Sequence, residues 1–179
     1  GQRVLSQFRP MGGIPGDPRP GQLRLRIHGE VDAPTTMTMR DLLALEQHEA
    51  DVDVHCVTGW SVLSAKVRGV SIETICRAVG VLDRAKHLVF EGAAGYTANV
   101  PLRALRHRNN LLAYRLDGVP LALENGAPLR AMVPDLYFWK SAKWVTGLRF
   151  VEEDAPGYWE TRGYHNRADP WEEQRYALF

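Results

Sequence analysis

Cysteine is scarce in this sequence, since Cys56 and Cys76 are the only two among 179 residues. So few thiols exclude a disulfide-rich scaffold, and a structural zinc site would need histidine ligands as well. The sequence contains neither a C-x-x-C pair nor a C-x-x-C-H segment. Thioredoxin-like redox chemistry and covalent haem attachment are therefore not indicated.

An excess of one charge is also absent, because 22 Lys and Arg residues face 21 Asp and Glu residues. This balance argues against a chain built to bind nucleic acid in general. No apolar run approaches the roughly 20 residues that span a bilayer, so we expect no transmembrane segment. We expect the protein in the cytoplasm. Because the first residue is Gly1 rather than Met, the periplasm is the alternative if an export signal was removed.

The length and the apolar fraction of 45% fit one globular domain with a real core. The first 21 residues carry four Pro and five Gly, so we expect an irregular N-terminal arm at 1–21 and a domain at 22–179. We expect that domain to end in a tail that packs on the body through aromatic anchors. These anchors are Tyr158, Trp159, Tyr164, Trp171, Tyr176 and Phe179.

Periodicity predicts many short strands and few helices. Alternation of apolar and polar residues predicts strands at 22–29, 51–57, 87–90, 96–100, 111–116, 129–133 and 144–152. Thr38 is placed to cap a helix at 39–45, and Ser71 and Gly80 are placed to begin and end a helix at 72–79. Residues 116–120 predict a hairpin turn. The fold class predicted is α+β, mostly antiparallel β-sheet with scattered short helices.

Residues 55–61 (HCVTGWS) place Cys56 where a predicted strand enters a glycine-containing loop. Loops at strand ends commonly build sites on a rigid scaffold, although a buried structural thiol is the plainer interpretation. His55 is adjacent in the strand and points to the opposite face, so a Cys–His nucleophile is weakly supported. Cys76 lies on the apolar face of a predicted helix and is expected to be structural.

Residues 124–130 (ENGAPLR) and 138–144 (FWKSAKW) bring Arg130, Lys140, Ser141 and Lys143 into one part of the sequence. Such cations and a hydroxyl could surround a phosphate with charge-assisted hydrogen bonds. A solvated basic edge strand is the alternative. The interleaved aromatic residues would also suit stacking on single-stranded nucleic acid, but the neutral overall charge counts against that partner.

Three blocks together make the sequence resemble the molybdopterin-binding domain of the sulfite oxidase family. The blocks are residues 55–61, residues 112–130 and residues 138–144, in this order and at these separations. The family includes bacterial sulfite-oxidase-like proteins and the catalytic subunit of the periplasmic methionine sulfoxide reductase. The resemblance runs from about residue 22 to the C-terminus, and residues 163–171 are similar to the tail of small bacterial members.

This resemblance implies a sulfite-oxidase-type molybdopterin-binding fold and one molybdenum-bearing pyranopterin, with the Cys56 thiolate as the single protein ligand to the metal. A soft thiolate suits that role. The resemblance further implies that a tyrosine, Tyr114, lies near the metal. The positions expected to hold the pterin and its phosphate are His55, Asn125, Arg130, Ser141, Ala142 and Lys143. Sulfite oxidases of animals have histidine at the position of Asn125. The methionine sulfoxide reductase branch has asparagine there, as this chain does.

The activity implied is oxygen-atom transfer at molybdenum, with a small-molecule oxygen-atom donor or acceptor and a separate electron-transfer partner. A non-catalytic molybdopterin-binding or carrier protein is the alternative. We expect a monomer that binds no nucleic acid. We also expect at least one of Trp60, Tyr114 and Trp139 to line an open substrate funnel, which would favour a substrate with an apolar part.

Overall fold

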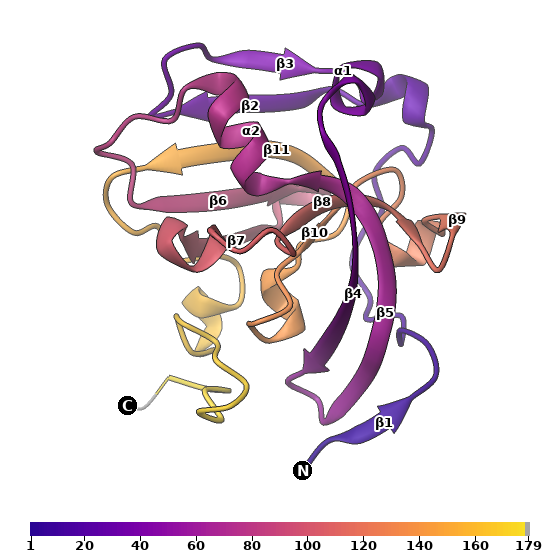
Figure 1. Ribbon diagram of the computed structural model, residues 1–179. Coiled ribbons are helices and arrows are strands. Elements are labelled where there is room, and N and C mark those ends of the chain that lie inside the picture. Colours follow the sequence, from indigo (N-terminus) through magenta and orange to yellow (C-terminus); the bar gives the residue numbers. More distant parts are fainter. Residues whose placement is uncertain (178–179) are drawn as a thin grey trace.

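The computed structural model describes residues 1–177, and two β-sheets make up most of the regular secondary structure (Figure 1). In the six-stranded sheet the order is β1-β5-β8-β10, with β4 paired to β5 and β9 paired to β8. Its strands are β1 (Arg3–Leu5), β4 (Gln47–Cys56), β5 (Trp60–Ser71), β8 (Leu111–Leu116), β9 (Val119–Pro120) and β10 (Arg130–Met132). The β4–β5 hairpin is long, and β1 lies beside its tip (Figure 1).

The five-stranded sheet has the order β3-β2-β11-β6-β7. Its strands are β2 (Leu25–Gly29), β3 (Thr35–Met37), β6 (His87–Gly92), β7 (Thr97–Pro101) and β11 (Val145–Val151). The strand pairs β1–β5 and β2–β11 are parallel and the other pairs are antiparallel. The predicted α+β class with mostly antiparallel sheet is therefore confirmed.

The two α-helices begin where the capping residues predict. In α1 (Met39–Ala44), the Thr38 hydroxyl accepts a hydrogen bond from the Asp41 amide, and the Asp41 carboxylate accepts one from the Thr38 amide. In α2 (Ile72–Val79), Ser71 accepts from the Thr74 amide and Gly80 ends the helix with a φ of 64°. No helix within residues 1–177 is long and apolar enough to cross a membrane.

Six short 3₁₀ helices supply most of the remaining regular structure. They are η1 (Pro20–Gln22), η2 (Ala93–Gly95), η3 (Leu102–Leu105), η4 (Leu123–Asn125), η5 (Phe138–Lys140) and η6 (Glu160–Arg162). The hairpin turn predicted at 116–120 is confirmed, because Leu116 pairs with Val119 across Asp117 and Gly118, which both have positive φ. An Asp-Gly pair in this conformation is the preferred connection for a two-residue hairpin.

Apolar residues from both sheets and both helices form the main core. Leu25, Ile75, Phe90, Leu112 and Phe150 are among its fully buried members. A second cluster lies along the β4–β5 hairpin and contains Cys56 together with Val52, Val54 and Trp60. The alternation that placed Val52, Val54 and Cys56 on one buried face is therefore confirmed.

Two parts of the six-stranded sheet differ from the sequence prediction. Residues 3–5 of the arm expected to be irregular form β1, which pairs with Trp60–Val62 of β5. The twelve-residue strand β5 was not predicted, because its alternation is interrupted. Ser64 has a φ of 53°, and the register shifts between Arg68 and Gly69. Irregularities of this kind break the period of two on which strand prediction depends.

Candidate cofactor cavity

A cavity of about 530 Å³ lies where six parts of the chain meet. Its walls come from the N-terminal arm, the β4–β5 turn, η2, the segments around η4 and η5, and the C-terminal tail. The volume falls within the range of pockets that bind cofactors. Six residues singled out from the sequence line it together: Cys56, Asn125, Arg130, Ser141, Ala142 and Lys143.

Cys56 reaches the cavity because it is the last residue of β4 and the turn to β5 is short. Cys56 pairs with Trp60, and the turn closes with a 3.0 Å hydrogen bond from the Gly59 amide to the Cys56 carbonyl. Gly59 has a φ of 89°, which favours glycine at the last position of a three-residue hairpin loop. The Cys56 side chain is buried, with Sγ 3.1 Å from the hydroxyl oxygen of Thr58.

Arg130 presents a buried positive charge to the cavity. The residue is only 2% exposed, and burial lowers the pKa of its guanidinium. The guanidinium donates to the carbonyls of Asn125 and Ser141 at 2.9 Å each and stands over the ring of Phe138 at 4.3 Å. No carboxylate within residues 1–177 forms a salt bridge with it. A buried cation without a counter-charge is costly, so this site favours an anion.

Lys143 brings a second positive charge close to the first. Its Nζ donates to the carbonyls of Gly12 at 2.6 Å and Glu124 at 3.1 Å. Burial and, next, the charge of Arg130 lower the pKa of Lys143 to about 8. Arg130 lowers this pKa because the two positive charges lie close enough to repel each other. An anion bound in the cavity would offset that repulsion.

Anion binding in the cofactor-free protein is expected to weaken as the pH rises through about 8, because Lys143 then loses its proton. The lysine is charged below this pKa and neutral above it. Sulfate is a suitable probe, since its own charge is constant over this range. Calorimetric titration should give several-fold weaker sulfate binding one pH unit above the pKa than one unit below it. Lys143→Arg should remove this dependence, and an unchanged pH profile in Lys143→Ala would contradict the assignment.

The backbone around Arg130 and Lys143 leaves no room for a larger residue at Gly126. Gly126 has a φ of 107°, and a Cβ there would lie 3.1 Å from the Cβ atoms of Arg130 and Lys143. Ser141 accepts a 2.9 Å hydrogen bond from the Val133 amide, so its hydroxyl is partly engaged in the fold. Asn125 is half-buried and lines the cavity.

Lys140 does not belong to the cavity, and the alternative of a solvated basic edge strand is wrong. Phe138–Lys140 form η5, and the Lys140 side chain is fully buried. Its Nζ lies 2.6 Å from the Glu160 carboxylate and donates to Asn99. Glu160 also accepts a 2.7 Å hydrogen bond from the indole of Trp139. Lys140 therefore ties the C-terminal tail to the body.

Aromatic side chains form much of the cavity wall. The aromatic residues that line it are Tyr96, Phe138, Trp139, Trp144, Tyr158, Trp159 and Tyr164. Trp139 is thus the one of the three expected funnel aromatics that lines the cavity, whereas Trp60 is buried in the cluster beneath Cys56. Of the expected tail anchors, Tyr158, Trp159 and Tyr164 line the cavity, whereas Trp171 and Tyr176 are 78% and 59% exposed, so the anchor prediction is confirmed only in part. The anchor Phe179 lies outside the described residues.

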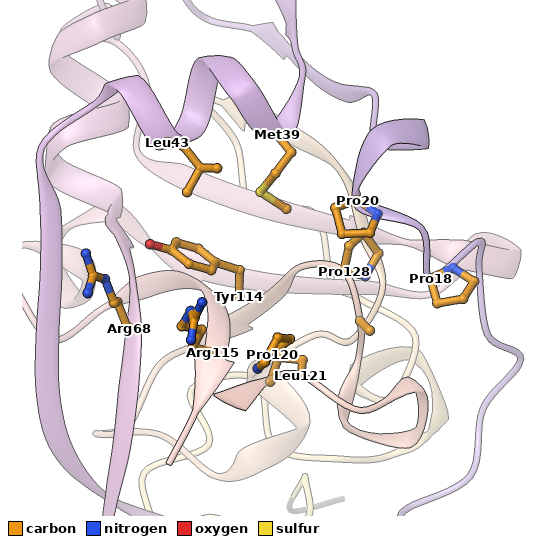
Figure 2. A pocket seen from close by; sticks show the side chains of 11 residues that line it. Pro18, Pro20, Met39, Leu43, Arg68, Tyr114, Arg115, Pro120, Leu121 and Pro128 are labelled. Atoms are coloured by element: carbon orange, nitrogen blue, oxygen red, sulfur yellow. The ribbon is translucent and has the colours of Figure 1, made fainter. Parts of the chain in front are cut away.

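Tyr114 does not line this cavity. Its ring lies in a separate groove beside Met39 and Leu43 of α1, and its hydroxyl donates to Gln47 Oε1 at 2.8 Å (Figure 2). Successive residues of a strand face opposite sides, and the preceding residue, Ala113, packs in the cluster that contains Cys56. The expectation that Tyr114 lies near Cys56 is therefore corrected.

The tyrosine that borders both Arg130 and Trp139 in the cavity is Tyr96. Its hydroxyl donates to the carbonyl of Trp139 at 2.6 Å, and burial raises its pKa. Tyr96 is the first residue of the strand predicted at 96–100, and the sequence predicted no functional role for it. The signal available was its position directly after the η2 turn, at a strand end.

His55 lies outside the cavity, on the other face of β4. Its Nδ1 is 2.8 Å from the Ser61 hydroxyl, and its ring centroid is 5.2 Å from that of Trp171. The Ser61 hydroxyl in turn donates to Gln2, which donates to the Cys56 carbonyl. His55 is therefore linked to the Cys56 carbonyl through Ser61 and Gln2, and its side chain does not line the cavity as expected for a cofactor-binding residue.

The N-terminal arm contributes a wall that the sequence analysis missed. Residues of the arm that line the cavity are Arg9, Met11, Gly12, Gly13 and Ile14. A Cβ at Gly13 would lie 2.6 Å from the ring of Trp144, so the arm packs closely against that side chain. The adjacent glycines Gly12 and Gly13 indicate that the backbone of the arm could approach another part of the chain closely. The sequence does not indicate that this part is Trp144.

Known proteins have sequences similar to this chain. Residues 11–159 match the family described as the oxidoreductase molybdopterin binding domain. The chain is 43% identical over 153 residues to the uncharacterized oxidoreductase YuiH of Bacillus subtilis, covering 86% of this chain and 77% of YuiH. It is 28% identical to the protein-methionine-sulfoxide reductase catalytic subunit MsrP of Ralstonia nicotianae, covering 87% of this chain and 53% of that protein.

Two further similarities involve longer proteins. Mitochondrial sulfite oxidase of Drosophila melanogaster is 30% identical, with 72% of this chain and 27% of that protein covered. The sulfane dehydrogenase SoxCD of Paracoccus pantotrophus superposes with a TM-score of 0.69 at 23% identity, over 75% of this chain and 39% of that chain, which shows a common fold. The chain thus spans about half the length of the MsrP relative and about a quarter of the sulfite oxidase. It belongs to the oxidoreductase molybdopterin-binding domains of the sulfite oxidase family, whose cofactor is molybdenum-bearing molybdopterin.

Proposed function

We propose that this oxidoreductase transfers an oxygen atom to or from a small molecule at a molybdenum centre to which Cys56 contributes the protein ligand. One observation carries the proposal: a single cavity contains a buried thiol together with two cations that have no carboxylate partner in residues 1–177. A thiolate suits a soft metal, and the cations suit the phosphate of a pterin.

The residues present fit a metal that arrives with its own organic ligand. Within residues 1–177 no group of three or more His, Cys, Asp and Glu side chains is placed to hold a metal ion. A metal bound at Cys56 would therefore take its other ligands from the cofactor or from solvent. When bound, the cofactor would supply a metal centre able to exchange two electrons with a substrate.

The protein's own residues would bind and orient that group. Arg130 and Lys143, which both line the cavity, would neutralise the phosphate. The Thr58 hydroxyl, 3.1 Å from Cys56 Sγ, is placed to donate a hydrogen bond to the thiolate. Such outer contacts orient a ligand and tune the metal. Tyr96 adds a hydroxyl beside Arg130 in the same cavity.

The aromatic wall favours a substrate with an apolar part, such as a sulfoxide or an N-oxide, over bare sulfite. Tyr164 contacts both Trp139 and Trp159, with ring centroids 5.0 and 4.8 Å apart, and all three residues line the cavity. Apolar surface rewards the burial of apolar substrate atoms and offers little to a small dianion. The name of the MsrP relative, a protein-methionine-sulfoxide reductase, supports the same substrate class.

The test is a steady-state assay of protein produced in a molybdenum-replete host. We expect molybdenum by elemental analysis, and reduction of an aryl or alkyl sulfoxide with a reduced viologen dye as electron donor. Efficient oxidation of sulfite together with inert sulfoxides and N-oxides would contradict the substrate assignment. Bound molybdenum without turnover of either class would favour the alternative, a molybdopterin-binding or carrier protein.

We further propose that electrons reach or leave the site through a separate protein. The relative MsrP is itself named a catalytic subunit, which supports the existence of such a partner for that protein. We propose that this oxidoreductase itself is a monomer. In the assay, the dye takes the place of the electron-transfer partner.

A further inference from the structure

Two successive backbone carbonyls, those of Cys56 and Val57, accept hydrogen bonds from residues at opposite ends of the chain. Gln2 donates from Nε2 to the carbonyl of Cys56 at 3.2 Å. Arg175 donates from Nη1 to the carbonyl of Val57, 118 residues away in the sequence. The Cys56–Gly59 turn is thus fixed by the N-terminal arm at one carbonyl and by the C-terminal tail at the next.

Arg175 is well placed to hold this carbonyl because its own side chain is fixed. Its Nε lies 2.7 Å from the Glu173 carboxylate, and its guanidinium stands over the Tyr137 ring at 5.2 Å. The side chain is only 20% exposed. A planar guanidinium that donates in several directions at once loses little further freedom when it binds one more carbonyl.

The tail that carries Arg175 is folded back on itself and attached to the body. Tyr164 and Tyr176 form an antiparallel bridge, and the His165 amide donates to the Arg175 carbonyl at 3.2 Å. The Tyr137 amide donates to the carbonyl of Ala168, which is fully buried, at 2.7 Å. These contacts fix Arg175 relative to η5 and hence to the cavity.

This tail lies largely outside the part of the chain that defines the family. The family match ends at residue 159, whereas Tyr164 lines the cavity and Arg175 holds the turn after Cys56. The main part of the domain therefore supplies the thiol and the cations, and the segment beyond it supplies a contact that restrains the thiol.

We propose that Arg175 is a positioning residue that keeps the Cys56 side chain buried and directed into the cavity by holding the Val57 carbonyl. The restraint is present in the cofactor-free protein, where it preserves the geometry of the thiol. Its consequence for metal ligation rests on the proposed function, because it requires Cys56 to be the ligand.

The test measures how readily Cys56 reacts with iodoacetamide in the cofactor-free protein. A Cys76→Ala background leaves Cys56 as the only thiol. A buried thiol reacts through local opening of the structure, so its alkylation rate at constant pH reports how often the turn opens. Loss of a charge-assisted hydrogen bond should make Arg175→Ala react roughly ten- to a hundredfold faster, as followed by mass spectrometry.

Two further variants separate this contact from general loosening of the tail. Arg167→Ala removes the ion pair to Asp169, also in the tail and 3.1 Å long, without touching the Cys56 turn, so its alkylation rate should equal that of the background. Arg175→Lys retains a charged donor and should restore part of the protection. Equal rates for Arg175→Ala and the background, with both folded by circular dichroism, would overturn the proposal. An equal increase in Arg167→Ala would also overturn it.

In the molybdenum-loaded protein, Arg175→Ala should alter the electron paramagnetic resonance spectrum of the metal and lower kcat more than it raises KM. An unchanged spectrum and kcat would overturn the role in ligation. If the unmodified protein binds no molybdenum, the proposed function fails, while the alkylation rates still decide whether Arg175 restrains the turn.

Discussion

Cys56→Ser is expected to abolish turnover and to remove the protein's sulfur from the metal. A serine oxygen is a harder donor and a much weaker ligand for a metal that prefers thiolates. X-ray absorption at the molybdenum edge should therefore show one sulfur scatterer fewer. Loss of an outer contact to a metal ligand typically costs about 10–100-fold in activity, and loss of the ligand itself should exceed this. The side chain changes little in size, so the fold should remain intact.

Cys76→Ala is the matched control for this experiment. Cys76 lies on α2 and packs against the main core, and burial raises the pKa of its thiol to about 11. Cys76 does not line the cavity, and its raised pKa disfavours the thiolate form that binds metals. The variant should keep its activity and lose about 1 kcal/mol of stability in a denaturant titration. Equal activity in the two cysteine variants would reject Cys56 as the ligand.

Local sequence patterns predicted much of the scaffold around Cys56. Thr38, Ser71 and Gly80 mark helix ends through contacts with residues within a few positions along the chain, so a sequence pattern suffices to find them. The position of Cys56 at the end of a strand likewise follows from alternation within β4. The cations and the serine hydroxyl of the cavity were singled out from their residue types, whereas the roles given to Asn125 and Ala142 rest on the resemblance.

The choice between Tyr114 and Tyr96 illustrates what a single sequence does not specify. Both residues lie in or beside predicted strands, and which side chain reaches the cavity depends on the strands that neighbour each of them. A one-residue change of register reverses the face of every side chain in a strand. In β8, the pairing with β5 and β10 directs Ala113 to the Cys56 side and Tyr114 to the groove beside α1 (Figure 2).

Lys140 and the N-terminal arm were misjudged for a related reason. The segment that contains Lys140 and Lys143 looks uniformly basic, but the buried carboxylate of Glu160 neutralises Lys140 and leaves Lys143 to the cavity. That difference depends on a residue 20 positions further along the chain. Irregular segments such as residues 9–14 have no period to analyse, so their contacts depend entirely on the finished fold.

Arg130→Ala is expected to yield folded protein that retains far less molybdopterin. Each charge-assisted hydrogen bond to a buried anion is worth about 1.5–3 kcal/mol, which corresponds to roughly ten- to a hundredfold in affinity. Cofactor released by denaturation and quantified by the fluorescence of its oxidised form should fall accordingly. Arg130→Lys should retain an intermediate amount, because it keeps the charge but loses the planar fork.

The stability of the cofactor-free Arg130 variants separates anion binding from a purely structural role. Arg130→Ala removes hydrogen bonds to the carbonyls of Asn125 and Ser141, which destabilises the fold, but it also removes a buried charge that has no carboxylate partner. Because these effects oppose each other, Arg130→Ala should lower the stability of the cofactor-free protein only slightly. It should lower the stability of the cofactor-loaded protein more, because there it also removes contacts to the bound anion. Arg103→Ala, at an exposed site in η3 away from the cavity, should match unmodified protein in both states. Equal stability losses for Arg130→Ala with and without cofactor, together with full cofactor content, would show that Arg130 serves the fold alone.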